Sequence, residues 1–245
     1  MTLTQAQRDG LLHELSEDYL RRSGWWSSLE TQQACDTSGP CPWFTYSATR
    51  YLAGIVRPSY RVFEYGSGNS SRWWASRAAE VVSVEHDPLW AEHLRSDKLQ
   101  NVVVVEKHMD EPTAFQHSKI LLSQYPHASM AARLSSDPTR NYRAGLLDDC
   151  FHAYASVLLE FPKQYFDVVV VDGMARVLTT WVAVRQLGPE GVIVFDNSDR
   201  DEYQSAYDYL RAQGFVRLDF WGLGPINRYE WCTSIFTRSL CSLQA

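Results

Sequence analysis

The chain has 245 residues, of which 45% are hydrophobic and 21% charged, enough for one large α/β domain. Its formal net charge of -6 leaves no basic surplus to neutralise a phosphate backbone, so we expect no nucleic-acid partner and favour a small-molecule or glycan partner. No apolar run approaches the roughly 20 residues of a membrane span, and the N-terminus lacks the apolar segment of a signal peptide, so we expect a cytoplasmic protein without a membrane partner. The sequence leaves a homodimer as an open alternative.

The first 60 residues predict a cap region in three parts. Residues 5–22 predict an amphipathic helix, because apolar side chains recur there at helical spacing. These side chains are Leu11, Leu12, Leu15, Tyr19 and Leu20. Residues 23–46 are rich in aromatic residues but broken by glycine and proline, which predicts an irregular segment lying on the core. Residues 47–56 predict a helix that ends before Pro58.

From residue 61 onward, short apolar runs alternate with helical patterns, which is typical of βαβ units and a mostly parallel sheet. The expected strands are 61–65, 81–85, 102–106, 166–172, 191–196, 216–221 and 233–238. The last two are joined by turn formers, which predicts an antiparallel hairpin at one edge. We therefore expect an α/β, Rossmann-like fold: a seven-stranded, mostly parallel sheet with an antiparallel last strand and helices on both faces. This core would span residues 61–245, with an insertion at about 107–164 that holds helices near 113–125 and 146–161.

The first strand of this core runs into a glycine loop. Residues 61–71 read Arg-Val-Phe-Glu-Tyr-Gly-Ser-Gly-Asn-Ser-Ser, so the strand leads into Gly66 and Gly68 and then into a helix. Glycines allow a sharp turn and a close approach of the backbone to a ligand, and exposed amides at a helix start bind electron-rich groups. We interpret the segment as a cofactor loop; the alternative is a tight turn that uses glycine for geometry alone.

An acidic residue ends the next strand. Residues 81–88 read Val-Val-Ser-Val-Glu-His-Asp-Pro, which places Glu85 at the carboxyl end. A carboxylate there can accept hydrogen bonds from both hydroxyls of a ribose. Nicotinamide dehydrogenases share this arrangement, but their third glycine position falls on Ser71 here, so that alternative fits less well.

These two segments resemble the first two motifs of the class I methyltransferases. The motifs are an acidic residue followed by Gly-x-Gly, here Glu64-Tyr-Gly66-Ser-Gly68, and a ribose-binding acid, here Glu85. The resemblance covers about residues 61–238 and implies a methyltransferase that binds S-adenosylmethionine. It also implies that Glu64 lies near the methionine end of the cofactor. The residues implied in cofactor binding are Glu64, Gly66, Ser67, Gly68, Asn69, Ser70, Glu85, His86, Asp172 and Gly173.

The fourth and fifth expected strands end in Asp172 and Asp196, and Asn197 follows the latter. Because ligands of open α/β sheets bind at the carboxyl ends of the strands, we expect the two acids to be neighbours in the crevice beside the glycine loop. Two carboxylates and an amide oxygen suit Mg²⁺, and the trio resembles the metal ligands of catechol and caffeoyl-CoA O-methyltransferases. That family has a lysine base just after the first Asp, whereas the residues after Asp172 read Gly-Met-Ala-Arg, ending at Arg176. The alternative is that both acids cap helices and Asn197 turns the chain.

Asp172, Asp196 and His86 are therefore the candidate proton acceptors, with Arg176 as a further candidate catalytic residue. Arg176, Arg200 and Arg228 could each bind a carboxylate or phosphate on the acceptor. Aromatic side chains suited to sugar rings or flat acceptors are expected near the strand ends: Trp43, Tyr46, Tyr203, Trp221, Tyr229 and Trp231. The sequence favours O-methylation of a small molecule, sugar or natural product. The alternatives are N-methylation of a small amine and non-catalytic binding of a nucleotide cofactor.

Overall fold

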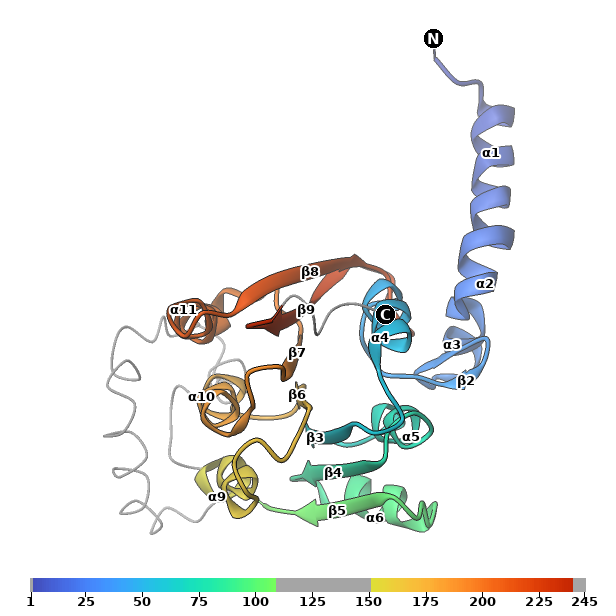
Figure 1. Ribbon diagram of the computed structural model, residues 1–245. Coiled ribbons are helices and arrows are strands. Elements are labelled where there is room, and N and C mark those ends of the chain that lie inside the picture. The colour runs from blue at the N-terminus through green and yellow to red at the C-terminus, as the bar shows by residue number, and fades with distance from the viewer. Residues whose placement is uncertain (1, 109–150, 240–245) are drawn as a thin grey trace.

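The computed structural model describes residues 2–108 and 151–239. At its centre lies a seven-stranded sheet in the order β5-β4-β3-β6-β7-β9-β8 (Figure 1). The strands are β3 (Arg61–Tyr65), β4 (Glu80–Glu85), β5 (Val102–Glu106), β6 (Val168–Val171), β7 (Val192–Asp196), β8 (Val216–Gly222) and β9 (Trp231–Thr237). The pairs from β5 to β7 are parallel, and β9 runs antiparallel to both β7 and β8. The predicted fold, including its edge hairpin, is confirmed.

Helices cover both faces of this sheet. In Figure 1, α4 (Tyr46–Ile55), α5 (Asn69–Ala75) and α6 (Pro88–Ser96) lie on one side, and α9 (His152–Ser156), α10 (Arg176–Gln186) and α11 (Gln204–Ala212) lie on the other. Successive strand residues point to opposite faces, so neighbours along β3 enter different cores. Val62 belongs to the same buried cluster as Trp74 of α5, whereas Phe63 belongs to the cluster that contains Val182 of α10. Burial on both faces explains why the inner strands are apolar almost throughout.

The expected insertion lies largely outside the described residues, and the predicted helix 113–125 lies wholly outside them. Of the helix predicted at 146–161, the structure describes α9 and a following 3-10 turn, Val157–Glu160. No helix among residues 2–108 and 151–239 is long and apolar enough to cross a membrane.

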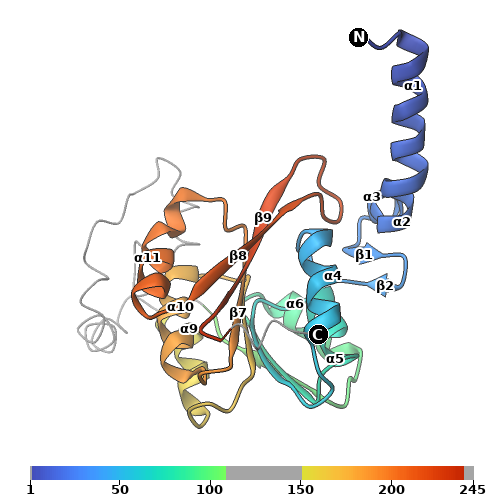
Figure 2. The same ribbon diagram turned by 45° about the horizontal axis from the view of Figure 1, so that its top comes forward.

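The N-terminal helix is confirmed and is continuous from Gln5 to Ser23. It comprises α1 (Gln5–Glu14), a π-helical segment (Leu15–Leu20) and α2 (Arg21–Ser23). Figures 1 and 2 show α1 standing clear of the rest of the molecule.

The segment predicted to be irregular is more regular than expected. It holds α3 (Trp25–Thr31) and a small hairpin of β1 (Cys35–Asp36) with β2 (Gly39–Pro40). Gly24 links α2 to α3 with a φ of 86°, and a Cβ there would lie 2.4 Å from the Asp36 Cα. Sequence patterns miss this packing because the contact is tertiary.

Candidate functional site

The glycine loop joins β3 to α5 at the point where the strand order changes direction, between β3 and β6, and a crevice forms at such a point in open α/β sheets. Gly66 has a φ of 93°, and a Cβ there would lie 3.0 Å from the backbone of Gly173. A Cβ on Gly68, by contrast, would meet no heavy atom within 4 Å. The first glycine therefore lets two backbones touch, and the second faces open space that a ligand can fill.

Glu64 lies beneath this loop and is fully buried at 0% exposure. Its Oε2 atom accepts hydrogen bonds from Ser71 Oγ at 2.5 Å and Ser83 Oγ at 3.0 Å, while its buried Oε1 atom has no partner among the described residues. Burial raises the pKa of Glu64 to about 7, although the serine hydroxyls act in the opposite direction. A buried acceptor without a donor can bind a ligand that supplies one.

Glu85 ends β4 and has both carboxylate oxygens occupied. Oε2 accepts from the backbone N–H of Ser67 at 2.8 Å and from its hydroxyl at 2.9 Å. Oε1 accepts from the backbone N–H groups of His86 and Asp87, each at 2.8 Å. Burial alone would raise the pKa of Glu85, but hydrogen bonds from His86, Asp87 and Ser67 together lower it to about 2. The carboxylate is thus held ionised beside the loop, with the Ser67 hydroxyl bound to Oε2.

Asp172 and Asp196 follow β6 and end β7, which are adjacent parallel strands, so the structure places the two acids side by side. Asp196 is 3% exposed, and its Oδ1 atom accepts from Trp231 Nε1 at 3.0 Å and Thr233 Oγ1 at 2.6 Å. The Asp172 side chain is 25% exposed and is the more accessible of the two. Burial and the neighbouring Asp196 charge raise the pKa of Asp172, and burial also raises that of Asp196.

Arg176 begins α10 and lies buried between these strand ends. Its five N–H donors have five acceptors: the backbone carbonyls of Gly173, Asp196 and Asp172, together with Asn197 Oδ1 at 3.2 Å and Asp172 Oδ1 at 3.0 Å. No donor remains for an acceptor carboxylate or phosphate. The guanidinium instead ties the end of β6 to the end of β7.

This arrangement does not fit the expected Mg²⁺ site. Asp172 Oδ1 and Asn197 Oδ1 both accept from the Arg176 guanidinium, and Asp196 Oδ1 already accepts from two side chains. A divalent cation would be left with one oxygen of each aspartate, would have to displace the guanidinium from the Asn197 oxygen, and would meet a fixed positive charge next to these groups. Neither acid caps a helix, because α10 and the 3-10 turn Asp201–Tyr203 begin after Ala175 and Arg200. Asn197 does turn the chain, with a φ of 53°.

The N-terminal cap reaches the same acid. The backbone N–H of Thr45 donates to Thr233 Oγ1 at 3.1 Å, and this hydroxyl in turn donates to Asp196. All three residues are buried, and Asp196 and Thr233 are partners in the register of β7 with β9. Sequence patterns do not reveal Thr45 and Thr233, because the pairing of β7 with β9 brings Thr233 to Asp196 and the packing of the cap brings Thr45 to Thr233.

The remaining candidates are dispersed. His86 binds Glu85 through Nδ1 at 2.8 Å and lies on β4's side of the site, with β3 between it and the two acids. Its ring packs near Phe151 and Tyr154, with centroids 6.0 and 6.4 Å away, two residues that the sequence analysis missed. Arg200 is half-buried and its charge lowers the Asp172 pKa, whereas Arg228 is exposed.

The aromatic candidates divide into two groups. Tyr46, Tyr203 and Trp231 are buried core residues, whereas Trp43, Trp221 and Tyr229 expose 46%, 55% and 64% of their surface. Trp231 underlies the hairpin loop, because a Cβ on Gly224 would meet both its indole and the Phe44 carbonyl. The cap and the loop therefore form one wall near Asp196.

Comparisons with known proteins return distant likenesses only. No protein-family model matches the chain, and no curated protein matches it. Many solved structures resemble it, among them the following three. A precorrin-6y C5,15-methyltransferase from Geobacter metallireducens is 14% identical with a TM-score of 0.48, over 78% of this chain and 86% of that one. A precorrin 8W decarboxylase from Methanobacterium thermoautotrophicum is 15% identical with a TM-score of 0.49, over 84% and 97%. A TehB-like SAM-dependent methyltransferase from Corynebacterium glutamicum is 14% identical with a TM-score of 0.46, over 91% and 98%. Likenesses this distant carry no information about the reaction, which must be inferred from the chain's own residues.

Proposed function

We propose that the chain is an S-adenosylmethionine-dependent methyltransferase that methylates a hydroxyl oxygen of a small molecule, sugar or natural product. One observation carries the proposal. At the point where the strand order changes, the open space in front of Gly68 lies beside two buried carboxyl groups, those of Glu64 and Glu85. The ionised Glu85 suits a ribose hydroxyl at Oε2, and the unpartnered Glu64 Oε1 suits an ammonium or hydroxyl donor.

The cofactor's fit requires one local change. Ser67 now donates its hydroxyl to Glu85 Oε2, so a ribose hydroxyl would replace that bond after a rotation of the serine side chain. The Ser67 backbone N–H can keep its own bond to the same oxygen. When bound, S-adenosylmethionine supplies a methyl group on a positively charged sulfur, and the carboxylates lining the loop favour that charge.

Asp172 is the residue that we assign to proton removal. Its side chain is accessible, whereas Asp196 is buried and accepts from Trp231 and Thr233. Bound S-adenosylmethionine would supply its methyl group to the acceptor oxygen, the sulfur would keep the electron pair of the broken carbon–sulfur bond, and Asp172 would take up the hydroxyl proton. Burial and the neighbouring Asp196 raise the pKa of Asp172, which makes its carboxylate a stronger base than an ordinary aspartate.

Positioning accounts for the rest of the proposed catalysis. Arg176 fixes the Asp172 carboxyl through Oδ1, so the base keeps its place without a metal ion. Arg200, half-buried and close enough for its charge to lower the Asp172 pKa, is the arginine available to an anionic group on the acceptor. The nearby acids would equally attract an ammonium group, which keeps N-methylation of an amine as the second candidate.

Two measurements test this function. Calorimetry should show S-adenosylmethionine binding to the intact protein, with a large loss of affinity in Glu85→Ala; absence of binding by the folded protein would exclude a methyltransferase. Transfer from radiolabelled S-adenosylmethionine to a panel of sugars, phenols and amines then separates O- from N-methylation. We expect turnover to be unchanged by EDTA, and activity that is lost to EDTA and restored by Mg²⁺ would contradict the assignment of Arg176.

A further inference from the structure

Glu64 is a carboxyl group buried without a counter-ion. Its side chain is fully enclosed beneath the glycine loop, and within the described parts of the chain it forms no ion pair. The arginines of neighbouring elements are engaged elsewhere: Arg72 of α5 pairs with Asp97, and Arg176 of α10 pairs with Asp172. A buried carboxylate without a cation beside it is costly, because the charged form loses its hydration.

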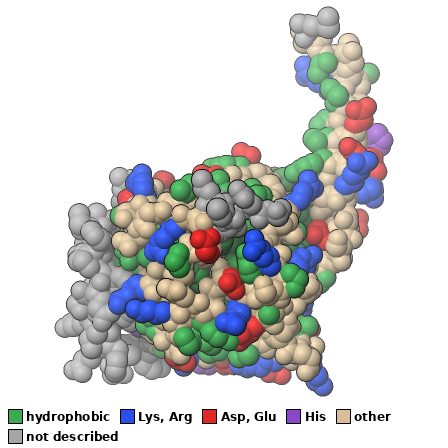
Figure 3. All heavy atoms as spheres, viewed as in Figure 1, with side chains coloured by type: hydrophobic (Ala, Val, Ile, Leu, Met, Phe, Trp, Pro, Cys, Tyr) green, Lys and Arg blue, Asp and Glu red, His purple; other side chains and the backbone are tan. Residues whose placement is uncertain are grey.

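The polar groups around Glu64 do not supply a positive charge. Three hydroxyl groups face it from α5 and β4, those of Ser70, Ser71 and Ser83. The charged groups that act on it are carboxylates, Glu85 at the end of β4 and Asp172 after β6. Burial is the main cause that raises the pKa of Glu64 to about 7, and the like charge of Glu85 adds to it against the effect of the hydroxyls. On the described part of the face in Figure 3, acidic and basic side chains are interspersed, so these local groups rather than a broad surface patch determine the charge around Glu64.

A bound cofactor would change this balance of charge. Glu64 and Glu85 lie on adjacent parallel strands, and Glu85 comes two residues after Ser83, the register partner of Glu64. With strands about 4.8 Å apart and a rise of about 3.3 Å per residue, the two glutamate Cα atoms are about 8 Å apart. In S-adenosylmethionine a short chain through the sulfur joins the ribose to the amino group. A ribose at Glu85 therefore lets the ammonium group reach the space beside Glu64.

We propose that Glu64 is a proton-release site that couples cofactor binding to pH, a role that rests on the proposed function. The empty protein holds Glu64 as a neutral carboxylic acid, which gives up its proton to solvent when an ammonium group binds beside it. The O–H bond of the acid breaks, its electron pair stays on the carboxylate, and the unpartnered Oε1 gains a donor. Below neutral pH, binding must expel this proton, so the affinity falls as the pH falls.

Calorimetry in two buffers of different ionisation enthalpy measures the protons released on binding. S-adenosylhomocysteine is the probe, because it keeps the ribose and the ammonium group but lacks the positive charge on sulfur. A nearby opposite charge lowers the pKa of a carboxyl group by roughly 1–3, so we expect the intact protein to release about half a proton or more at pH 6. Methylthioadenosine keeps the nucleoside and the sulfur but has no amino acid, and its binding should release none.

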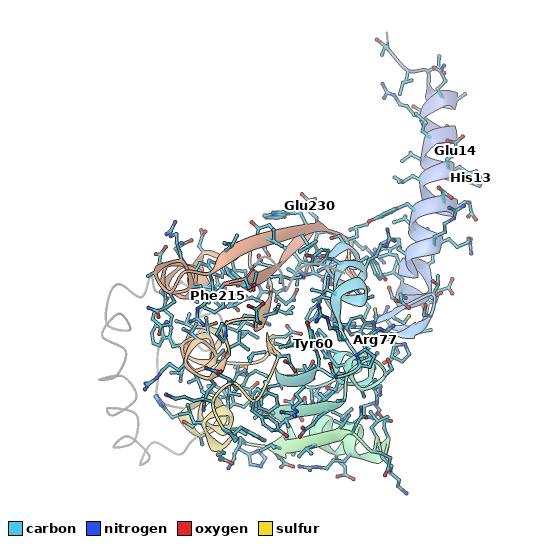
Figure 4. The ribbon with its side chains drawn as sticks, in the orientation of Figure 1. His13, Glu14, Tyr60, Arg77, Phe215 and Glu230 are labelled. Atoms are coloured by element: carbon cyan, nitrogen blue, oxygen red, sulfur yellow. The ribbon has the colours of Figure 1, made fainter. Side chains whose placement is uncertain are left out.

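A matched pair of variants assigns the proton to Glu64. Glu64→Gln keeps the shape of the side chain and should abolish the release. It should also remove the pH dependence of affinity between about pH 5.5 and 7, over which wild-type affinity should rise at least about fourfold. Glu80→Gln makes the same exchange at the other end of β4 and should leave both unchanged. Figure 4 labels Tyr60 and Arg77 at that end, where the Tyr60 carbonyl accepts from the backbone N–H of Ala79.

Three results would overturn this role for Glu64. They are binding of S-adenosylhomocysteine without proton exchange, equal release with methylthioadenosine, and unchanged release in the folded Glu64→Gln variant. Circular dichroism checks that the variant is folded, and if it is not, the comparison of the two probes on the wild-type protein decides the question. Absence of all binding by the folded protein would overturn the proposed function and this inference with it.

Discussion

Replacement of Arg176 by lysine should weaken the whole fold as well as the site. The guanidinium serves five acceptors from β6, β7 and the turns after them, and lysine has three donors on a single nitrogen. At least two acceptors therefore lose their donor. Each buried acceptor left without a partner costs about 1–3 kcal/mol, so we expect Arg176→Lys to lower the free energy of unfolding by about 2–6 kcal/mol. That is a large share of the roughly 5–15 kcal/mol by which domains are stable.

Urea unfolding followed by tryptophan fluorescence measures this loss directly. Arg50→Lys is the matched control, because it makes the same exchange at an exposed position on α4, where we expect a change within about 0.5 kcal/mol. If Arg176→Lys unfolds at the same urea concentration as the control, the guanidinium does not hold the strand ends together. A smaller urea dependence in the variant would instead indicate that a partly unfolded state has become populated.

Further predictions concern the glycines and the two glutamates. Gly173→Ala should cost about 1–3 kcal/mol, because its Cβ would lie 2.0 Å from the Tyr154 hydroxyl and 2.8 Å from Gly66 N. Gly68→Arg meets no heavy atom but is strained at a φ of 157°, and it should leave a folded protein that no longer binds S-adenosylmethionine by calorimetry. The lowered pKa of Glu85, about 2 against an ordinary 4.5, means that its carboxylate contributes stability above pH 4.5 that is lost as the pH falls toward 2, so the gap between wild type and Glu85→Gln should close over that window. The raised pKa of Glu64, about 7, has the opposite sign: stability is lost as the pH rises from 4.5 to 7, and Glu64→Gln should lack this decline in urea titrations. A flat difference between either variant and wild type across its window would contradict the corresponding burial or hydrogen-bond assignment.

Short-range sequence patterns predicted the strands and the glycine loop, because these features depend on residues that are neighbours in the chain. The valine runs of β4 and β6 predicted strands, because a strand covered on both faces is largely apolar. The run of β5 predicted a strand as well, although this edge strand is partly exposed. The glycine loop and the adjacent positions of Asp172 and Asp196 followed from the rule that ligands bind at strand ends. The small β1–β2 hairpin was missed, since four paired residues carry no periodic signal.

The function of Arg176 could not be predicted in the same way. Arg176 follows Asp172 closely in the chain, which suggested that its side chain binds the acceptor. The carbonyl groups that accept its hydrogen bonds instead include those at the ends of β6 and β7, and the sheet sets the distance between these two ends. Thr45 and Thr233 are separated by 188 residues and meet only because the last strand inserts between β7 and β8. Such contacts depend on tertiary register, which one sequence does not display.

The link from Thr45 through Thr233 to Asp196 has a consequence for biosynthesis. The acid is synthesised before β9, and its hydrogen-bond partners Trp231 and Thr233 belong to that strand, while the cap residue that orders Thr233 is synthesised first of all. A nascent chain that has emerged only as far as β7 would carry both aspartates and the glycine loop, yet Asp196 would lack both side-chain donors. Chains cut short before β9 should therefore be unable to assemble this pair of acids, however well the preceding parallel strands have formed.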